Sequence, residues 1–358
     1  ASSFPFVFYL EPVLNLVSIL KGQPASCSLK IFWRRERSLN YQTANLLLSQ
    51  WNYAGALKIL EQWSSKLSML CEYKLDASDI EELNKSQSNL SKILEALRIA
   101  DFCFNLDMKQ VQSQTIQWQN KFGELPPDLT KLTKPINSEN YNIILNLYTQ
   151  CRIFWEIDQI ANFLARMQSF YEAVLKQLLS SLEMDSYIDI DKNTGNWNPN
   201  DQKITNQDLT RYITKFRNDQ KKNGHPVRNL SSRISQKILI KCFIGSFSTK
   251  DQRLTNEILK CLDELDYWCV QRNNLIHRAK GISKATMQEL DEEKRTFNKN
   301  SCESDKICSV MANICKNPLC AIPQELRENY VEPSLNFYLY SNARSWIQEL
   351  LREEAKKI

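Results

Sequence analysis

The sequence contains few of the residues that interrupt helices. Only 7 of its 358 residues are glycine, and no proline occurs between Pro24 and Pro126. Within that interval glycine occurs only at Gly55 and Gly123. Glycine and proline destabilise a helix interior most, whereas the abundant Leu, Lys, Glu and Gln favour helix. The composition therefore predicts an all-α protein.

Histidine is also scarce, with only two in the chain. His225 stands in an Asn-Gly-His-Pro turn and has no partner at a useful spacing. No pair of metal-binding histidines and no Ser/His/Asp triad can be assembled from so few. This scarcity directs attention to the surroundings of the second histidine, His277.

A long uncharged apolar segment is missing as well. The run from Phe4 to Leu20 contains Glu11 and two prolines, and no basic leader precedes it. We therefore expect neither a signal peptide nor a membrane-spanning helix, and no membrane partner. The net charge of +5 is mildly basic, which permits nucleic acid as a partner without requiring it.

The cysteines have no tight spacing framework. Their number, eleven, is odd and they are widely spread, so reduced thiols in a cytoplasmic protein are the expectation. A late cluster lacks a C-x-x-C pair and a nearby histidine, which leaves a zinc site as the weaker alternative to buried free thiols. This cluster consists of Cys302, Cys308, Cys315 and Cys320.

Three regions are predicted along the chain. Residues 1–36 are interpreted as a residual α/β segment, with a short helix at Val13–Leu20 and an alternating, strand-like pattern at Ser28–Trp33. Residues 37–135 form a helical connector, and residues 136–358 the main helical domain. The finer expectations begin with a turn at 51–53, a helix over 107–122 and a boundary near 125–135. Residues 141–184 are expected to form either one continuous helix or two helices that meet near Asp158. A loop over 185–205 is expected next, then helices over 207–221, 228–244, 250–280 and 283–296, an irregular stretch over 297–334 and a last helix over 341–357.

The helix predicted over 250–280 ends in a chemically distinctive group. Apolar residues recur at helical spacing as far as Trp268, and Arg272, Asn273 and His277 then follow. Asn273 and His277 are four residues apart and so share a helix face. A guanidinium, an amide and an imidazole together suit acid–base chemistry on a phosphate. A purely structural interpretation, in which cations complement the negative end of the helix dipole, is the alternative.

Residues 211–241 form a basic segment. They carry many Lys and Arg residues and only one acidic residue, Asp219. Arg233, Lys237 and Lys241 follow one another at four-residue steps, which predicts a stripe that contacts RNA phosphates or an ordinary solvated face. The acidic residues at 263, 264 and 266 are predicted to form a solvated helix face.

The segment Arg272-Asn273-x-x-x-His277 at a helix end resembles the R-N-x-x-x-H motif of HEPN ribonucleases. The residues that follow, 278–283, are similar to the HEPN branch of type III CRISPR-associated ancillary ribonucleases, and the segments 51–57 and 170–175 add weaker similarity. This resemblance implies an elongated helical bundle with a HEPN core in residues 136–358.

The resemblance also implies a function. The protein would be a metal-independent, cofactor-free endoribonuclease that cleaves single-stranded RNA by attack of the 2′-hydroxyl and takes part in type III CRISPR antiviral defence. Arg272, Asn273 and His277 would be catalytic, Arg278 and Lys280 would help to bind RNA, and a homodimer would complete the site.

Family members usually carry an N-terminal CARF sensor that recognises cyclic oligoadenylate, and residues 1–36 could supply only the end of such a domain. Three alternatives stay open: a HEPN toxin controlled by a partner protein, a non-catalytic helical RNA-binding module, and a helical protein–protein scaffold.

Overall fold

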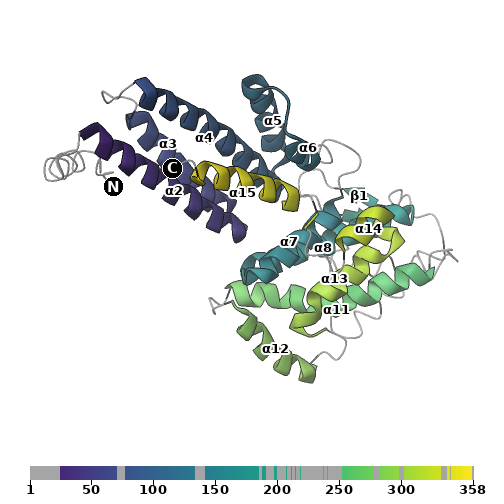
Figure 1. Ribbon diagram of the computed structural model, residues 1–358. Coiled ribbons are helices and arrows are strands. Elements are labelled where there is room, and N and C mark those ends of the chain that lie inside the picture. Colours follow the sequence, from purple (N-terminus) through teal and green to yellow (C-terminus); the bar gives the residue numbers. More distant parts are fainter. Residues whose placement is uncertain are drawn as a thin grey trace. The chain divides into compact units, whose positions relative to one another are not determined.

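Helices dominate the computed structural model of the chain (Figure 1). It describes residues 25–70, 77–133, 142–184, 188–190, 197–199, 252–277, 282–297, 302–331, 337–338 and 340–356, together with isolated helical positions at 207, 211, 214, 218, 237 and 240. The prediction of a mostly helical protein is confirmed. Two structural units divide the chain: unit 1 comprises residues 1–141 and 339–358, and unit 2 comprises residues 142–338.

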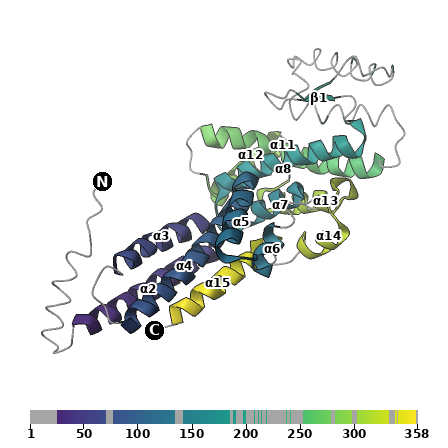
Figure 2. The ribbon, with the colours of Figure 1, turned by 90° about the horizontal axis from the view of Figure 1, so that it is seen from above.

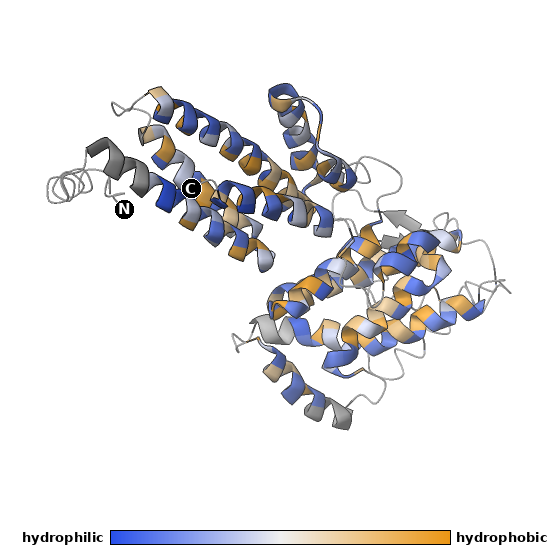
Figure 3. Cartoon of the chain, in the orientation of Figure 1, coloured by the Kyte–Doolittle hydropathy of each residue, from blue (hydrophilic) through white to orange (hydrophobic). Residues whose placement is uncertain are grey.

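Unit 1 is built from long helices packed side by side (Figure 2). They are α2 (Ala25–Ser49), α3 (Tyr53–Leu70), α4 (Ala77–Phe104), α5 (Met108–Phe122), α6 (Pro127–Thr133) and α15 (Tyr340–Lys356). Consecutive helices from α2 to α5 pack against one another, and α15 packs against α2, α4 and α6. Figure 3 shows both hydrophobic and hydrophilic residues on each of these helices, as expected for amphipathic helices.

The structure corrects the prediction for residues 28–33. They belong to α2 and not to a strand. Further along this helix Trp33, Arg37, Tyr41, Ala44 and Leu48 are buried at spacings of three and four. This period gives a helix one continuous face to pack on α3 and α15, whereas the described residues of unit 1 contain no strand with which residues 28–33 could pair. The predicted helix at 13–20 lies outside the described residues.

Local signals placed several helix ends in unit 1 correctly. Asn52 precedes α3 and accepts a hydrogen bond from the Gly55 N–H at 2.8 Å, which confirms the predicted turn at 51–53. Asp107 caps α5 in the same way, and Gly123, with φ of 83°, follows its last residue. The helix predicted over 107–122 is therefore confirmed.

Unit 2 contains the helix that carries the motif. Its elements are α7 (Ile143–Glu156), α8 (Ile160–Ser181), β1 (Ile188–Ile190), β2 (Trp197–Pro199), α11 (Gln252–His277), α12 (Lys284–Phe297), η2 (Ser304–Lys306), α13 (Ile307–Lys316), η3 (Pro318–Cys320) and α14 (Gln324–Tyr330). The helices α7 and α8 meet at Asp158, whose φ is 60°, so the two-helix alternative for residues 141–184 is the correct one. The helix α11 packs against α8 and α13.

Two predictions in unit 2 are wrong. The loop predicted over 185–205 contains a short antiparallel ladder in which Ile188 pairs with Pro199 and Ile190 with Trp197. The stretch predicted to be irregular contains α13, which buries Ile307, Met311 and Cys315 at four-residue spacing. The cysteines and nearby breakers obscured this apolar stripe in the sequence.

The units do not coincide with the predicted domains. Unit 1 continues to residue 141, six residues beyond the predicted boundary at 135, and it includes α15. Tyr340, Ala343, Ile347 and Leu351 are buried on one face of α15, and Gln348 Nε2 donates to Ser49 Oγ of α2 at 3.0 Å. The range 136–358 is therefore not one structural unit, because its last helix completes the bundle formed by the first helices.

Among the helices of the described ranges, none combines the length and the hydrophobicity that a membrane crossing requires.

Candidate functional site

The helix α11 is firmly anchored over most of its length. Thr255, Ile258, Leu262, Leu265 and Trp268 are almost completely buried. The Trp268 indole N–H also donates to the Cys302 carbonyl at 3.0 Å. Complete burial reaches Cys269, whereas Val270 is 51 % exposed and Gln271 and Arg272 are half-buried. The part of α11 that precedes its last two turns is therefore well packed.

The motif lies in these last two turns. Arg272, Asn273 and His277 all belong to α11, which ends at His277. The prediction that the three residues close one helix is confirmed for the backbone. The side chains of Asn273 and His277, and the whole of Arg278 and Lys280, lie outside the described residues.

Arg272 makes a contact that the sequence did not reveal. Its Nη1 donates a hydrogen bond of 3.0 Å to Gln168 Oε1 in the middle of α8. The Nε2 of Gln168 donates in turn to Glu172 Oε1, also at 3.0 Å. Gln168 and Glu172 are four residues apart on one helix, a spacing visible in the sequence, but only the packing of α8 on α11 brings them to Arg272.

Lys237 is not part of an exposed basic stripe. Its side chain is buried, with the residue 6 % exposed, and its ammonium pairs with the carboxylates of Asp263 and Asp266. The Tyr171 hydroxyl donates to Asp266 Oδ1 at 2.6 Å. A buried ammonium requires such compensation, so the predicted contact of Lys237 with RNA is wrong.

Two further predictions concern the aspartates that pair with Lys237 and the other members of the basic stripe. Asp263 and Asp266 are partners of a buried lysine and do not form a purely solvated acidic face. The other two members of the predicted stripe, Arg233 and Lys241, lie outside the described residues. His225 lies outside them as well.

The late cysteines form packing contacts in the described part of unit 2. Cys302, Cys315 and Cys320 are buried, and all the described cysteines carry free thiols. Burial raises the pKa of Cys320 to about 12, so its thiol is protonated at neutral pH. Within the described ranges, no three His, Cys, Asp or Glu side chains are placed to hold a metal ion together.

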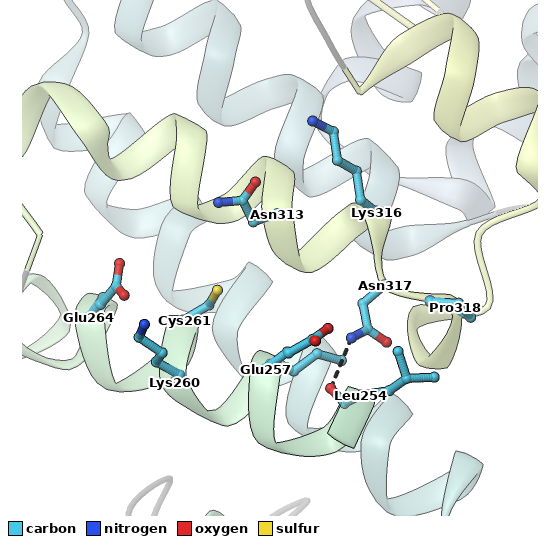
Figure 4. Close-up of a pocket in the computed structure, with 10 residues that line it drawn as sticks. Leu254, Glu257, Lys260, Cys261, Glu264, Asn313, Lys316, Asn317 and Pro318 are labelled. Atoms are coloured by element: carbon cyan, nitrogen blue, oxygen red, sulfur yellow. Dashed lines mark hydrogen bonds between the residues drawn. The ribbon is translucent and has the colours of Figure 1, made fainter. Parts of the chain in front are cut away.

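A pocket of about 390 Å³ opens between the first half of α11 and the segment formed by α13 and η3 (Figure 4). Glu257, Lys260 and Glu264 line it from α11, and Lys316 lines it from α13. Burial raises the pKa of the adjacent Cys261 to about 11, which makes this thiol a poor nucleophile at neutral pH. From residue 260 to Arg272 the helix rises about 18 Å, so this pocket is separate from the motif.

No protein-family model, curated protein or solved structure matches the chain. Its function is therefore inferred from the motif, from the helix that carries it and from the contacts of Arg272.

Proposed function

We propose that the protein is a metal-independent endoribonuclease that cleaves single-stranded RNA, with Arg272, Asn273 and His277 in its active site. One observation carries the proposal. Gln168 holds the guanidinium of Arg272 in the turn that follows the buried residues Trp268 and Cys269 of α11. A fixed cation at the end of an anchored helix, five residues before an imidazole, suits catalysis better than a freely moving charge does.

The reaction needs only groups that these residues possess. The 2′-hydroxyl of the RNA attacks the adjacent phosphorus, the new O2′–P bond forms, and the P–O5′ bond breaks. His277 moves the proton, taking it from the 2′-hydroxyl or giving it to the leaving 5′-oxygen. Arg272 stabilises the charge that develops on the phosphoryl oxygens, and Asn273 orients the imidazole or the phosphate. The products are a 2′,3′-cyclic phosphate and a 5′-hydroxyl.

The proposal includes the assembly and the setting that the HEPN resemblance implies. One motif supplies a single proton-transfer group, whereas cleavage requires both a base and an acid, so a homodimer would provide the second group. The proposed setting is type III CRISPR antiviral defence, with cyclic oligoadenylate as the activator wherever a sensor domain accompanies this chain. Arg278 and Lys280 are proposed to bind RNA beside the motif.

The alternative of a non-catalytic RNA-binding module is less well supported. It depends on the basic stripe, and Lys237, the only member of that stripe among the described residues, is buried against two aspartates. A HEPN toxin controlled by a partner protein would use the same catalytic residues and differs only in its regulation.

The test is cleavage of end-labelled single-stranded RNA in excess chelator, with and without cyclic oligoadenylate. We expect the parent protein to leave 2′,3′-cyclic phosphate ends. Arg272→Ala and His277→Ala should each lower the rate about 100-fold or more, with little change in the thermal unfolding curve. Arg253→Ala is the control, because this α11 arginine is 89 % exposed at the opposite end of the helix.

Three results would overturn the proposal. In the first, the parent protein cleaves RNA under neither condition. In the second, chelator abolishes the activity and a divalent metal restores it. In the third, Arg272→Ala or His277→Ala protein is folded and as active as the parent.

A further inference from the structure

We infer that Trp155 and Lys284 form an RNA-binding subsite beside the motif, in which Trp155 stacks on a base of the single strand and Lys284 binds a neighbouring phosphate. That the ligand is RNA rests on the proposed function, whereas the geometry of the two residues does not. The starting observation is that the Lys284 ammonium lies 5.1 Å from the centre of the Trp155 ring, although the two residues belong to different helices, α12 and α7.

The packing of α8 on α11 places Trp155 at the motif end of unit 2. Tyr171 of α8 bonds to Asp266 of α11, whereas Gln168, which comes earlier in α8, bonds to Arg272, which comes later in α11. The two helices are therefore antiparallel, and the start of α8 lies on the same side as the end of α11. Trp155 lies in the last turn of α7, directly before the corner that leads into α8.

The start of α12 returns to the same corner. The helix α11 ends at His277, and only residues 278–283 separate it from Lys284, the first residue of α12. The Lys284 ammonium lies 4.0 Å from Oδ1 of Asp158, the residue at which α7 and α8 meet. Its contacts with Asp158 and with Trp155 therefore hold Lys284 close to the end of the helix that carries the motif.

The Trp155 ring is fixed by the core and is still only half-buried. Phe163, which is completely buried, packs against it with ring centroids 5.0 Å apart and ring planes at 54°. Packing on one side therefore orients the ring, while another part of it stays in contact with solvent. An aromatic side chain held in this way offers a stacking surface to a base of any identity.

The contacts of Lys284 are of a kind that a phosphate can replace. The side chains of Lys284 and Asp158 are 36 % and 63 % exposed, and 4.0 Å is a long distance for an ion pair. Exposed pairs contribute little to stability. Helix stability does not account for this lysine either, because a cation is unfavourable in the first turn of a helix. The long stem lets the ammonium leave Asp158 for a phosphate while the methylene groups stay on Trp155.

An aromatic ring beside a lysine is the combination that proteins use to bind single-stranded nucleic acid. The ring stacks on a base and the ammonium neutralises the backbone, so neither contact depends on sequence. Stacking also requires an unpaired base, because the bases of a duplex are covered by their neighbours. The subsite therefore favours a single strand over a duplex.

Binding is measured by fluorescence anisotropy on a labelled RNA oligonucleotide that carries 2′-fluoro groups throughout and so cannot be cleaved. Trp155→Leu keeps an apolar side chain on Phe163 and removes the aromatic ring, so we expect affinity to fall roughly 5- to 100-fold. Trp155→Phe restores a ring and should stay within about 3-fold of the parent. Lys284→Gln should lower the slope of log affinity against log salt by about 0.7.

A second oligonucleotide, with the same backbone and several abasic positions, separates stacking from attraction by charge. The parent should bind the complete oligonucleotide more tightly than the abasic one. Trp155→Leu should lose roughly 5- to 100-fold of this preference, because it removes a contact with a base. Lys284→Gln should keep the preference, because it removes a contact with a phosphate.

The matched control comes from unit 1. Phe122 is also half-buried, and Lys121 Nζ lies 5.1 Å from the centre of its ring, so the same arrangement occurs in the unit that does not carry the motif. Phe122→Leu and Lys121→Gln should match the parent in affinity, in salt dependence and in preference for bases. Thermal unfolding of every variant shows whether a loss of binding follows from loss of the fold.

The outcomes distinguish this inference from the proposed function. If the parent cleaves RNA and folded Trp155→Leu matches Phe122→Leu in affinity and in preference for bases, the subsite is wrong and the nuclease stands. If Trp155→Leu loses both and the parent cleaves no RNA, the subsite stands and the nuclease proposal is wrong. If Trp155→Leu does not fold, Lys284→Gln decides, and a salt dependence equal to that of Lys121→Gln would overturn the inference.

Discussion

Three cations of this protein illustrate how the partner of a side chain indicates its role. Arg37 is 2 % exposed, lies 4.9 Å from the centre of the Trp33 ring and is 3.8 Å from Glu82. Lys237 is buried between two carboxylates. In both cases aromatic or acidic neighbours compensate the charge, as expected for a cation that stabilises a fold. Arg272 donates to the side-chain amide of Gln168 on the neighbouring helix α8.

Lys237 provides a test at the residue scale. Replacing it with methionine leaves Asp263 and Asp266 facing each other without their shared counter-ion. We expect Lys237→Met to lower the free energy of unfolding by about 1–3 kcal/mol, less than for a fully buried pair because both aspartates are partly exposed. Urea unfolding measures this loss.

The control for this prediction is Arg253→Met, because Arg253 forms an exposed pair with Glu257 at 3.1 Å. Its removal should cost about 0.5 kcal/mol or less. Equal stabilities of the two variants would show that the Lys237 cluster contributes no more than a surface ion pair.

The helix ends are the best-determined features at the scale of the element. The turn between α2 and α3 is compact, with Trp51 at φ of 57° and Asn52 capping α3 through the Gly55 N–H. A Cβ atom built on Gly55 would lie 2.7 Å from Asn52 Nδ2. Glycine is therefore required at this position because it gives the capping side chain room.

This arrangement predicts a double-mutant cycle. Asn52→Ala should lower the free energy of unfolding by about 1 kcal/mol, whereas Asn52→Ser, which can also cap, should cost only a few tenths of that. Gly55→Ala should lower the free energy of unfolding about as much as Asn52→Ala does, because the added methyl group displaces the capping side chain. Once Asn52 is alanine, Gly55→Ala should cost much less, since no cap remains to be displaced. Strictly additive losses in urea unfolding would contradict this account.

At the scale of the whole molecule, the proposed active site depends on a second copy of the chain. One Arg272–His277 set cannot both deprotonate the attacking hydroxyl and protonate the leaving oxygen, whereas two sets related by a two-fold axis can. Two cationic helix ends repel each other, and an RNA phosphate between them relieves that repulsion. We therefore expect RNA to strengthen the dimer.

Subunit mixing tests this prediction. Parent protein is mixed with a threefold excess of His277→Ala protein and left until subunits have exchanged. If both histidines of a dimer are needed, random pairing leaves about one-sixteenth of the dimers active, compared with about one-quarter for independent subunits. RNA cleavage rates at constant total protein give the answer, and a mixture with Arg253→Ala protein controls for exchange itself. A monomer that cleaves at the full rate would contradict the composite site.

The sequence alone determined those features that depend on neighbours within a few residues. The scarcity of glycine and proline predicted a helical protein, and short-range signals at Asn52 and Asp107 placed two helix boundaries, whereas the pattern near Asp158 left open whether one helix or two would form. The position of the Arg272 motif at the end of α11 was predictable for the same reason, because the apolar stripe that precedes it is a property of one helix.

The tertiary structure decided what depends on contacts between distant residues. Gln168 and Arg272 are 104 positions apart, and nothing in either local sequence identifies the other as a partner. The four-residue spacing that suggested an exposed stripe at Lys237 is equally compatible with burial, and only the carboxylates of α11 decide between the two. Similarly, α15 is an ordinary amphipathic helix in sequence, and the buried faces of α2 and α4 place it in unit 1. Periodicity shows that a helix has a face to bury, but the partner of that face is set by packing across the whole chain.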